Sequence, residues 1–158
     1  LQRDIDALFI GNPTNSRRRA VMQSVRKGLD SSGIGLYNTD GLCFGTERTT
    51  LLNRASISLN LSQAPWEVAG LRFLISMACG AMVISEPIED PAPYTPGVHF
   101  VQVGIADMPD AIKYYLNNHK ERHRIVDAAY TYVTRELTME NSIRKILREI
   151  GIVDDSSH

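Results

Sequence analysis

Two short apolar runs, separated by a segment of helical periodicity, constrain the fold of this chain most strongly. The runs lie at residues 57–61 and 81–84. Between them, apolar residues recur at i, i+3, i+4 and i+7, the spacing of one buried helix face; they are Leu71, Leu74, Ile75 and Ala78. Gly80 predicts the end of this helix, because glycine adopts the left-handed conformation at little steric cost. Strand, helix and strand in this order predict a right-handed βαβ crossover within a parallel sheet.

The loop before this helix and its first turn are expected at the carboxyl edge of the sheet, where open α/β folds bind ligands. The loop carries Glu67, and the first turn carries Arg72. In one interpretation, Arg72 neutralises a phosphate while Glu67 accepts hydrogen bonds from hydroxyl groups. In a simpler interpretation, the two side chains pair with each other, and Glu67 is favoured by the positive end of the helix dipole.

The remaining segments continue the alternation of strands and helices. Apolar runs predict strands at residues 5–10, 33–37 and 99–103, and periodic segments predict helices at residues 17–29, 46–55, 107–116, 119–135 and 141–150. We expect Ser16 and Thr46 to cap the first two helices. The residues expected on the inward face of the first helix are Ala20, Val21, Ser24, Val25 and Gly28. This order predicts an α/β fold, a Rossmann-like, doubly wound, mostly parallel sheet with a helical C-terminus.

With 158 residues, the chain is long enough for one domain with a substantial core. We expect residues 1–153 to form this domain and residues 154–158 to form a flexible polar tail. The chain starts at Leu1 rather than methionine, so we expect an excised segment that lacks a partner domain.

Charge and cysteine content exclude several classes of protein. The net charge of −1 gives no basic field, so nucleic acid is not an expected partner. No apolar run approaches the roughly 20 residues of a transmembrane segment. With two cysteines and no visible signal peptide, a reducing, cytoplasmic location is expected.

A turn-rich segment after the first predicted strand favours anion binding. It begins at Gly11 and leads into a helix whose first turn carries Arg17, Arg18 and Arg19. The free N–H groups and the dipole at a helix N-terminus both favour phosphate. The alternative is a solvated, basic first turn. The spacing required for a phosphate-binding Walker loop or a dinucleotide fingerprint is absent.

Metal and hydrolase chemistry have little support. His119 and His123 are spaced i, i+4, but they lie in a charged helical segment without a third ligand nearby, so a solvated helix face is favoured over a metal site. Cys79 is expected to be a small buried apolar residue. There is no Gly-x-Ser-x-Gly elbow.

Four segments, in this order, resemble the C-terminal half of a GT-B glycosyltransferase of the group-1, CgeB-like type. They are residues 52–55, 58–62, 71–74 and 77–81, and the likeness extends to residues 11–13, 17–19, 114–116, Arg122 and 143–147. The Ala-Cys-Gly segment at 78–80 and the preceding Leu71-Arg72 are its most specific parts.

The resemblance implies a domain that binds a nucleoside diphosphate sugar. Glu67 aligns with a glutamate that contacts the sugar, which makes it the catalytic candidate. The family's second glutamate falls at Ile75, which cannot accept a hydrogen bond, and Ser76 beside it is the nearest polar substitute. The family's diphosphate contacts fall on Gly11, on Arg17 or Arg18, and on the helix start formed by Gly70, Leu71 and Arg72.

We therefore expect a donor-binding domain of a longer enzyme that transfers sugar to an unknown acceptor, with the N-terminal acceptor domain missing from this chain. It would need no cofactor and no obligatory metal, because the arginines stabilise the leaving diphosphate. An alternative is a non-catalytic domain with a vestigial nucleotide cleft that acts through protein contacts, which Ile75 favours. A flavodoxin-like or receiver domain is a third, weaker interpretation, because no acidic cluster or flavin loop is apparent.

Overall fold

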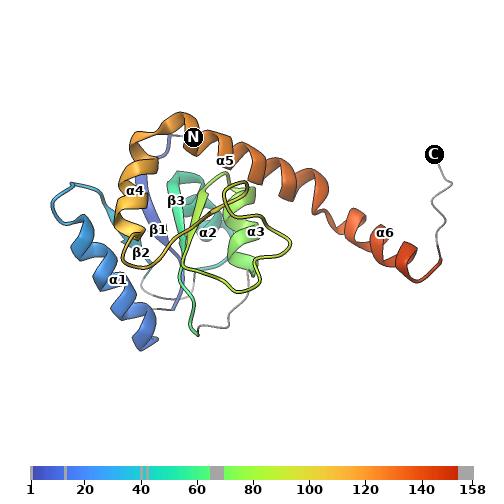
Figure 1. Cartoon of the computed structure of the whole chain (residues 1–158), viewed down its shortest axis with the longest axis horizontal. Helices are drawn as coiled ribbons and strands as arrows, with labels where there is room; N and C mark the ends of the chain where they lie inside the picture. Colours follow the sequence, from blue (N-terminus) through green and yellow to red (C-terminus); the bar gives the residue numbers. More distant parts are fainter. Residues whose placement is uncertain (1, 13, 40, 42, 65–69, 153–158) are drawn as a thin grey trace.

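A computed structural model describes residues 2–12, 14–39, 41, 43–64 and 70–152. Its centre is a five-stranded, all-parallel sheet with the order β2-β1-β3-β4-β5 (Figure 1). The strands are β1 (Ile5–Phe9), β2 (Leu36–Asn38), β3 (Ala55–Asn60), β4 (Met82–Ser85) and β5 (Val101–Gln102). The predicted Rossmann-like, doubly wound α/β fold is confirmed.

Helices cover both faces of this sheet (Figure 1). They are α1 (Ser16–Leu29), α2 (Gly45–Arg54), α3 (Leu71–Ala78), α4 (Met108–Asn117) and α5 (His119–Thr131). A further helix, α6 (Met139–Glu149), does not pack on the sheet. On one face, Val25 of α1 and Ile112 of α4 pack with Ile57 and Leu59 of β3 in the largest apolar cluster. On the other face, Leu52 of α2 packs against the sheet in a smaller cluster. The chain therefore forms a three-layer sandwich with a sheet buried on both sides, as parallel sheets require.

The βαβ unit from β3 to β4 agrees with the prediction. Helix α3 begins at Leu71, so Arg72 lies in its first turn. Gly80 follows the helix with φ of +67°, in the left-handed region that favours glycine. Strands β3 and β4 pair in parallel, with Ile57 opposite Met82.

The buried face of α3 was predicted wrongly. Leu71 is 63% exposed, whereas Phe73 and Met77 are buried, and Ala78 is also exposed. Phe73 and Met77 form a second i, i+4 apolar pair, and they pack with Phe100 in a cluster beneath the loop after β4. The larger aromatic ring takes the interior position, because it removes more apolar surface from water.

The predicted caps of the first two helices were also wrong. Asn15, not Ser16, caps α1, and its side chain accepts a hydrogen bond from the Arg18 N–H. Helix α2 starts at Gly45, one residue before Thr46, and it has no side-chain cap. The inward face of α1 includes Val21, Val25 and Gly28 as expected, and Gly28 packs closely against Pro109 of α4. Ala20 and Ser24 are exposed instead, and Arg18, Met22 and Leu29 are buried. Asn and Ser are equally good caps, so the sequence alone does not choose between neighbours.

The C-terminal third is helical, as predicted, but it is divided differently. The long helix predicted at residues 119–135 ends as α5 at Thr131 and continues as a π-helix, Tyr132–Glu136. Helix α6 then extends away from the body (Figure 1), and none of its residues is buried. Gly151 follows with a positive φ of +73°. The predicted tail lies outside the described residues. Among those described, no helix has both the length and the apolar character needed to cross a membrane.

Candidate functional site

The strand order reverses between β1 and β3, and this switch point is where open α/β sheets form their binding crevice. The chain leaves β1 at Ile10 and Gly11, and it leaves β3 at Leu61 and Ser62. A cavity of about 190 Å³ opens beside this point. The segment after β1 and the segment before α2 contribute Ile10, Gly11, Gly41, Cys43 and Phe44 to its wall. The remaining lining residues are Arg48 and Leu52 of α2, Ser58 of β3, and Leu71, Arg72, Ile75 and Ser76 of α3.

Gly11 is required by the ring of Phe9. A Cβ atom on Gly11 would lie 2.6 Å from the Phe9 Cζ atom, much closer than two non-bonded carbon atoms can approach. The Phe9 ring is 1% exposed and is held by the core around β1. The backbone at the end of β1 therefore approaches this ring closely, and a side chain at position 11 would displace one or the other.

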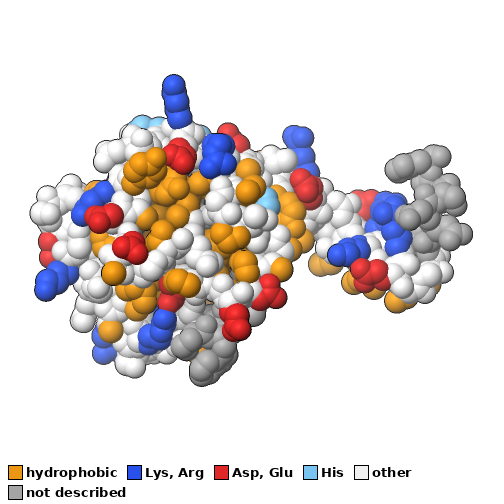
Figure 2. Space-filling view, in the orientation of Figure 1, with side chains coloured by type: hydrophobic (Ala, Val, Ile, Leu, Met, Phe, Trp, Pro, Cys, Tyr) orange, Lys and Arg blue, Asp and Glu red, His pale blue; other side chains and the backbone are white. Residues whose placement is uncertain are grey.

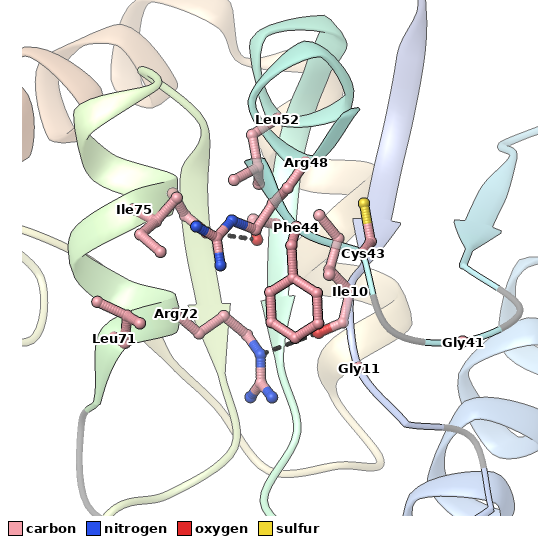
Figure 3. Close-up of a pocket in the computed structure, with 12 residues that line it drawn as sticks. Ile10, Gly11, Gly41, Cys43, Phe44, Arg48, Leu52, Leu71, Arg72 and Ile75 are labelled. Carbon is pink, nitrogen blue, oxygen red and sulfur yellow. Dashed lines mark hydrogen bonds between the residues drawn. The ribbon is translucent and has the colours of Figure 1, made fainter. Parts of the chain in front are cut away.

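Arg72 reaches across the carboxyl edge from the first turn of α3. Its Nε donates to the Ile10 carbonyl oxygen at 3.2 Å, and its Nη1 donates to Asn60 Oδ1 at 2.6 Å. Its guanidinium lies 5.3 Å from the centre of the Phe9 ring, within the range of a cation–π interaction. Figure 3 shows the guanidinium beside Ile10 at the mouth of the cavity. Arg72 is thus positioned between the ends of β1 and β3.

Arg18 approaches the same ring from α1. Its guanidinium lies 5.8 Å from the centre of Phe9, and its Nε donates to the Leu61 carbonyl oxygen at 2.8 Å. Arg18 is only 2% exposed. The alternative of a solvated first turn therefore does not hold for Arg18. Arg18 and Arg72 together place two cations around one aromatic ring at the switch point.

Arg17 is held by a carboxylate that the sequence analysis did not select. Its Nη1 donates to Glu86 Oε1 at 2.9 Å and to the Ser62 carbonyl oxygen at 2.8 Å, and its Nη2 pairs with Glu86 Oε2. Glu86 also accepts the Ser62 N–H at 2.5 Å. Burial raises the pKa of Glu86, but the hydrogen bonds from Arg17 and from the Ser62 N–H outweigh it and hold this pKa below its ordinary value. The pair fixes the loop after β3 to the start of α1.

Arg48 adds a cation to the cavity wall, beside apolar side chains. The Arg48 guanidinium lies 5.9 Å from the centre of the Phe44 ring, and Ile75 lies next to it in Figure 3. The Arg48 Nε is buried and has no hydrogen-bond partner among the described residues. Phe44 is 63% exposed. A donor without a partner and an exposed ring therefore line the same cavity, which gives it the chemistry to bind a flat, polar group.

The remaining predicted site residues occupy different positions. Gly70 is the N-cap of α3 and is exposed, and the exposed Leu71 lines the cavity. Ser76 also lines it, but it is fully buried, and its hydroxyl shares a hydrogen bond of 2.8 Å with Ser58. Glu67 lies outside the described residues.

Four site residues were missed by the sequence analysis: Phe44, Arg48, Asn60 and Glu86. Asn60 is the last residue of β3 and Glu86 directly follows β4. A rule that selects polar residues at the carboxyl ends of predicted strands would have found both. Phe44 and Arg48 lie around the start of α2, and no local pattern marks them.

The described residues include no group of three or more His, Cys, Asp or Glu side chains that could hold a metal. His119 and His123 are both exposed on α5. What the arrangement offers is a set of fixed cations, Arg17, Arg18 and Arg72, at the switch point, and Arg72 also lines the small, partly apolar cavity. Fixed guanidinium groups can donate hydrogen bonds to phosphoryl or carboxylate oxygens.

The chain resembles known proteins in its family match and in its fold. A family model described as "Glycosyl transferase-like" matches residues 36–148, more than two thirds of the chain. No curated protein matches the sequence.

Solved structures with the same fold are distant in sequence. TarM aligns with a TM-score of 0.72 and 13% identity over 96% of this chain and 36% of its own. HepE from Anabaena, in complex with UDP-glucose, aligns with a TM-score of 0.63 and 10% identity over 95% of this chain and 50% of its own. The C-terminal domain of LpcC, a glycosyl transferase group 1 family protein from Francisella tularensis, aligns with a TM-score of 0.65 and 15% identity over 88% of this chain and 89% of that domain. The present chain thus spans half or less of TarM and HepE.

Proposed function

Because the chain belongs to the glycosyl transferase-like family, we propose that it binds the nucleoside diphosphate sugar donor of a longer glycosyltransferase, which transfers the sugar to an acceptor. The observation that carries this proposal is the position of Arg18 and Arg72 around the Phe9 ring, at the switch point of the sheet. HepE, whose fold is shared, has been solved with UDP-glucose, which supports the choice of ligand class.

The diphosphate would lie over Gly11 and the first turns of α1 and α3. Gly11 leaves room for it, and Arg17 or Arg18 and Arg72 would donate to its oxygens, together with the N–H groups that follow Gly70. Each arginine already donates to carbonyl oxygens, which fixes its position before the ligand arrives. Such fixed donors stabilise the charge of the leaving diphosphate without reorganisation, so the proposal needs no resident cofactor and no obligatory metal.

The cavity between α2 and α3 would take the nucleoside. Phe44 offers an exposed ring on which a base can stack, and such stacking contributes about 1–3 kcal/mol per base. The buried Arg48 Nε needs an acceptor, which a ribose or base oxygen supplies. Leu71 and Ser76 would complete the wall. Glu67, which precedes α3 in the sequence, would orient the sugar.

The rest of the proposed enzyme includes a domain that this chain lacks. We assign the acceptor site to an N-terminal domain, so this chain alone would be inactive. We also assign the protein to the group-1, GT-B, CgeB-like type and its location to the cytoplasm. The exposed surface of α6 favours the presence of a second domain. Apolar side chains are exposed along one side of this helix, as its underside in Figure 2 shows, and another domain could cover them. They are Met139, Ile143 and Ile146 of α6 and Ile150, which directly follows it.

Calorimetry with the whole chain and a panel of nucleotides and nucleotide sugars, including UDP and UDP-glucose, tests the donor site. Arg72→Gln should weaken the binding of the preferred nucleotide about 10- to 100-fold, because a hydrogen bond to a charged group contributes about 1.5–3 kcal/mol. Arg26→Gln, on the exposed face of α1, is the matched control and should leave affinity unchanged. The donor-site proposal fails if the folded protein binds no member of the panel.

Ile75 favours the second candidate, a non-catalytic domain with a vestigial nucleotide cleft that acts through protein contacts. It places an apolar side chain beside Arg48, where the resembling family has a glutamate (Figure 3). Ile75→Glu would restore an acceptor for the ribose hydroxyls. A large rise in nucleotide affinity would support degeneration of the site, whereas an unchanged affinity would argue against it.

A further inference from the structure

A second, larger hollow lies at the opposite edge of the sheet from the donor site. It has a volume of about 550 Å³ and is lined by residues from the starts of β1 and β3, the loop after α1, the end of α4 and the start of α5. Four of its lining residues carry nitrogen groups that can bind anions: Arg3, Lys113, His119 and Arg122. In this region, the sequence analysis weighed the His119–His123 pair as a possible metal site, and it named Arg122 and residues 114–116 only as parts of the family resemblance.

Arg122 is a buried cation that has no carboxylate partner among the described residues. It is 8% exposed, and its Nη1 donates to the carbonyl oxygens of Tyr115 and Leu116 at 2.9 and 3.3 Å. These carbonyls belong to the last turn of α4, whose negative dipole end compensates only part of a full positive charge. A buried charge that is incompletely compensated is unfavourable, and an anion in the adjoining hollow would remove this penalty.

His119 is a neutral member of this cluster. Its Nδ1 lies 2.9 Å from the Arg122 Nη2. A guanidinium can only donate, so Nδ1 must accept and the ring proton resides on Nε2. The Nε2–H therefore remains available as a donor group that adds no charge.

Arg3 brings a second guanidinium to the hollow. Its Nη1 donates to the Leu52 carbonyl oxygen at 3.2 Å and also to that of Ala55, and its Nη2 donates to that of Cys79 at 2.8 Å. Burial lowers the pKa of Arg3, and the positive charge of Arg122 lowers it further. The two guanidinium groups therefore repel each other across the hollow, and neither forms an ion pair with a described carboxylate.

The balance of charge around the hollow is positive. Arg3, Lys113 and Arg122 are cations, and Asp6 is the single carboxylate in the lining, which leaves a net charge of +2 with His119 neutral. Asp6 accepts the Gly35 N–H at 3.0 Å. Lys113 pairs with Asp110 at 3.1 Å, but Asp110 is 84% exposed, so this pair contributes little and is easily exchanged.

We propose that this hollow, which Arg3, Lys113, His119 and Arg122 line, is a binding site for a phosphoryl group, separate from the donor site. A phosphate carries about −1.5 to −2 charges at neutral pH and three strong acceptor oxygens, which complement the charge and the donors present. The volume lies within the range of about 300–1,000 Å³ that is typical of small-molecule sites. The ligand is inorganic phosphate or a small phosphate monoester.

Nitrogen–proton correlation spectra of the whole chain, titrated with inorganic phosphate and separately with glycerol 3-phosphate, test this site. Saturable shifts are expected for the amides of Ser56, Lys113, His119 and Arg122. A stronger response to one probe identifies free phosphate or a monoester as the better ligand. Shifts confined to Gly11, Ser62 and Arg72 at the donor edge, or no saturable shift with either probe, would overturn the proposal and leave the donor-site proposal untouched.

Variants locate the charge that binds the phosphoryl group. Lys113→Gln, at a partly exposed position, should weaken phosphate binding at least fivefold, whereas Lys120→Gln, an exposed neighbour outside the hollow, should leave it unchanged. Equal weakening by the two variants would show a general charge effect and overturn the site. His119→Ala, also at an exposed position, provides a second test that does not require substitution of the buried Arg122, and it should weaken binding as well.

Discussion

Replacing Glu86 by glutamine should lower the free energy of unfolding by about 2–4 kcal/mol. The Glu86 side chain is 4% exposed and is paired with Arg17. Breaking a buried pair by removing one partner costs about 3–5 kcal/mol. Arg17 is 31% exposed, so water solvates it in part and lowers this cost. Glutamine also keeps an oxygen that can accept the Ser62 N–H.

The effect of this substitution should depend on pH in a defined direction. The pKa of Glu86 is lowered in the folded protein from its ordinary value of 4.5. A group of this kind stabilises the fold fully above its unfolded pKa, and it loses this contribution as the pH falls through the folded pKa. The difference between the original protein and Glu86→Gln should therefore be largest at neutral pH and should shrink as the pH falls below the ordinary value.

Urea unfolding followed by circular dichroism, at neutral pH and at successively lower pH, measures this difference. Glu89→Gln, an exposed carboxylate three positions further on, is the matched control, for which a change within about 0.5 kcal/mol is expected. The physical account of the pair is refuted if Glu86→Gln behaves like this control at neutral pH. It is also refuted if the loss is the same at every pH.

Three further predictions concern packing, and thermal unfolding checks each of them. Gly11→Ala should lower the free energy of unfolding by about 1–3 kcal/mol, because its Cβ would lie 2.6 Å from Phe9. Gly41→Ala is the control and should cause no such loss, because the space around its Cβ is open. Equal stability of the two variants would contradict the steric argument. Phe73→Ala should lower the free energy of unfolding by about 3–5 kcal/mol, since the ring is fully buried. A loss below about 1 kcal/mol would show that the Phe73 ring does not anchor α3. Ile146→Glu should change stability by less than about 0.5 kcal/mol, because this side chain of α6 is 57% exposed; a large loss would mean that α6 packs on the body of the domain.

The candidate site could be predicted only in part, and the two arginines next to each other on α1 show why. The sequence predicted an anion site after the first strand, and Arg17 and Arg18 lie in the first turn of α1, which follows this strand. Arg18 is nevertheless buried against Phe9, and Arg17 is held by Glu86, which is 69 positions away in the sequence. A local pattern specifies the end of a helix, but it carries no information about which distant carboxylate lies beside it.

The sequence by itself determined the order of the elements and the edge of the sheet at which Arg72 lies, because periodicity, glycine turns and the handedness of βαβ units are local properties of the chain. It did not determine which face of α3 is buried, because Leu71 and Phe73 start competing apolar stripes and the rest of the core selects between them. Tertiary structure also decided the partners of the arginines and gathered Arg3, Lys113 and Arg122 around one hollow. Contacts between such distant residues form only when the sheet is assembled, so the charge balance of both edges is a property of the fold.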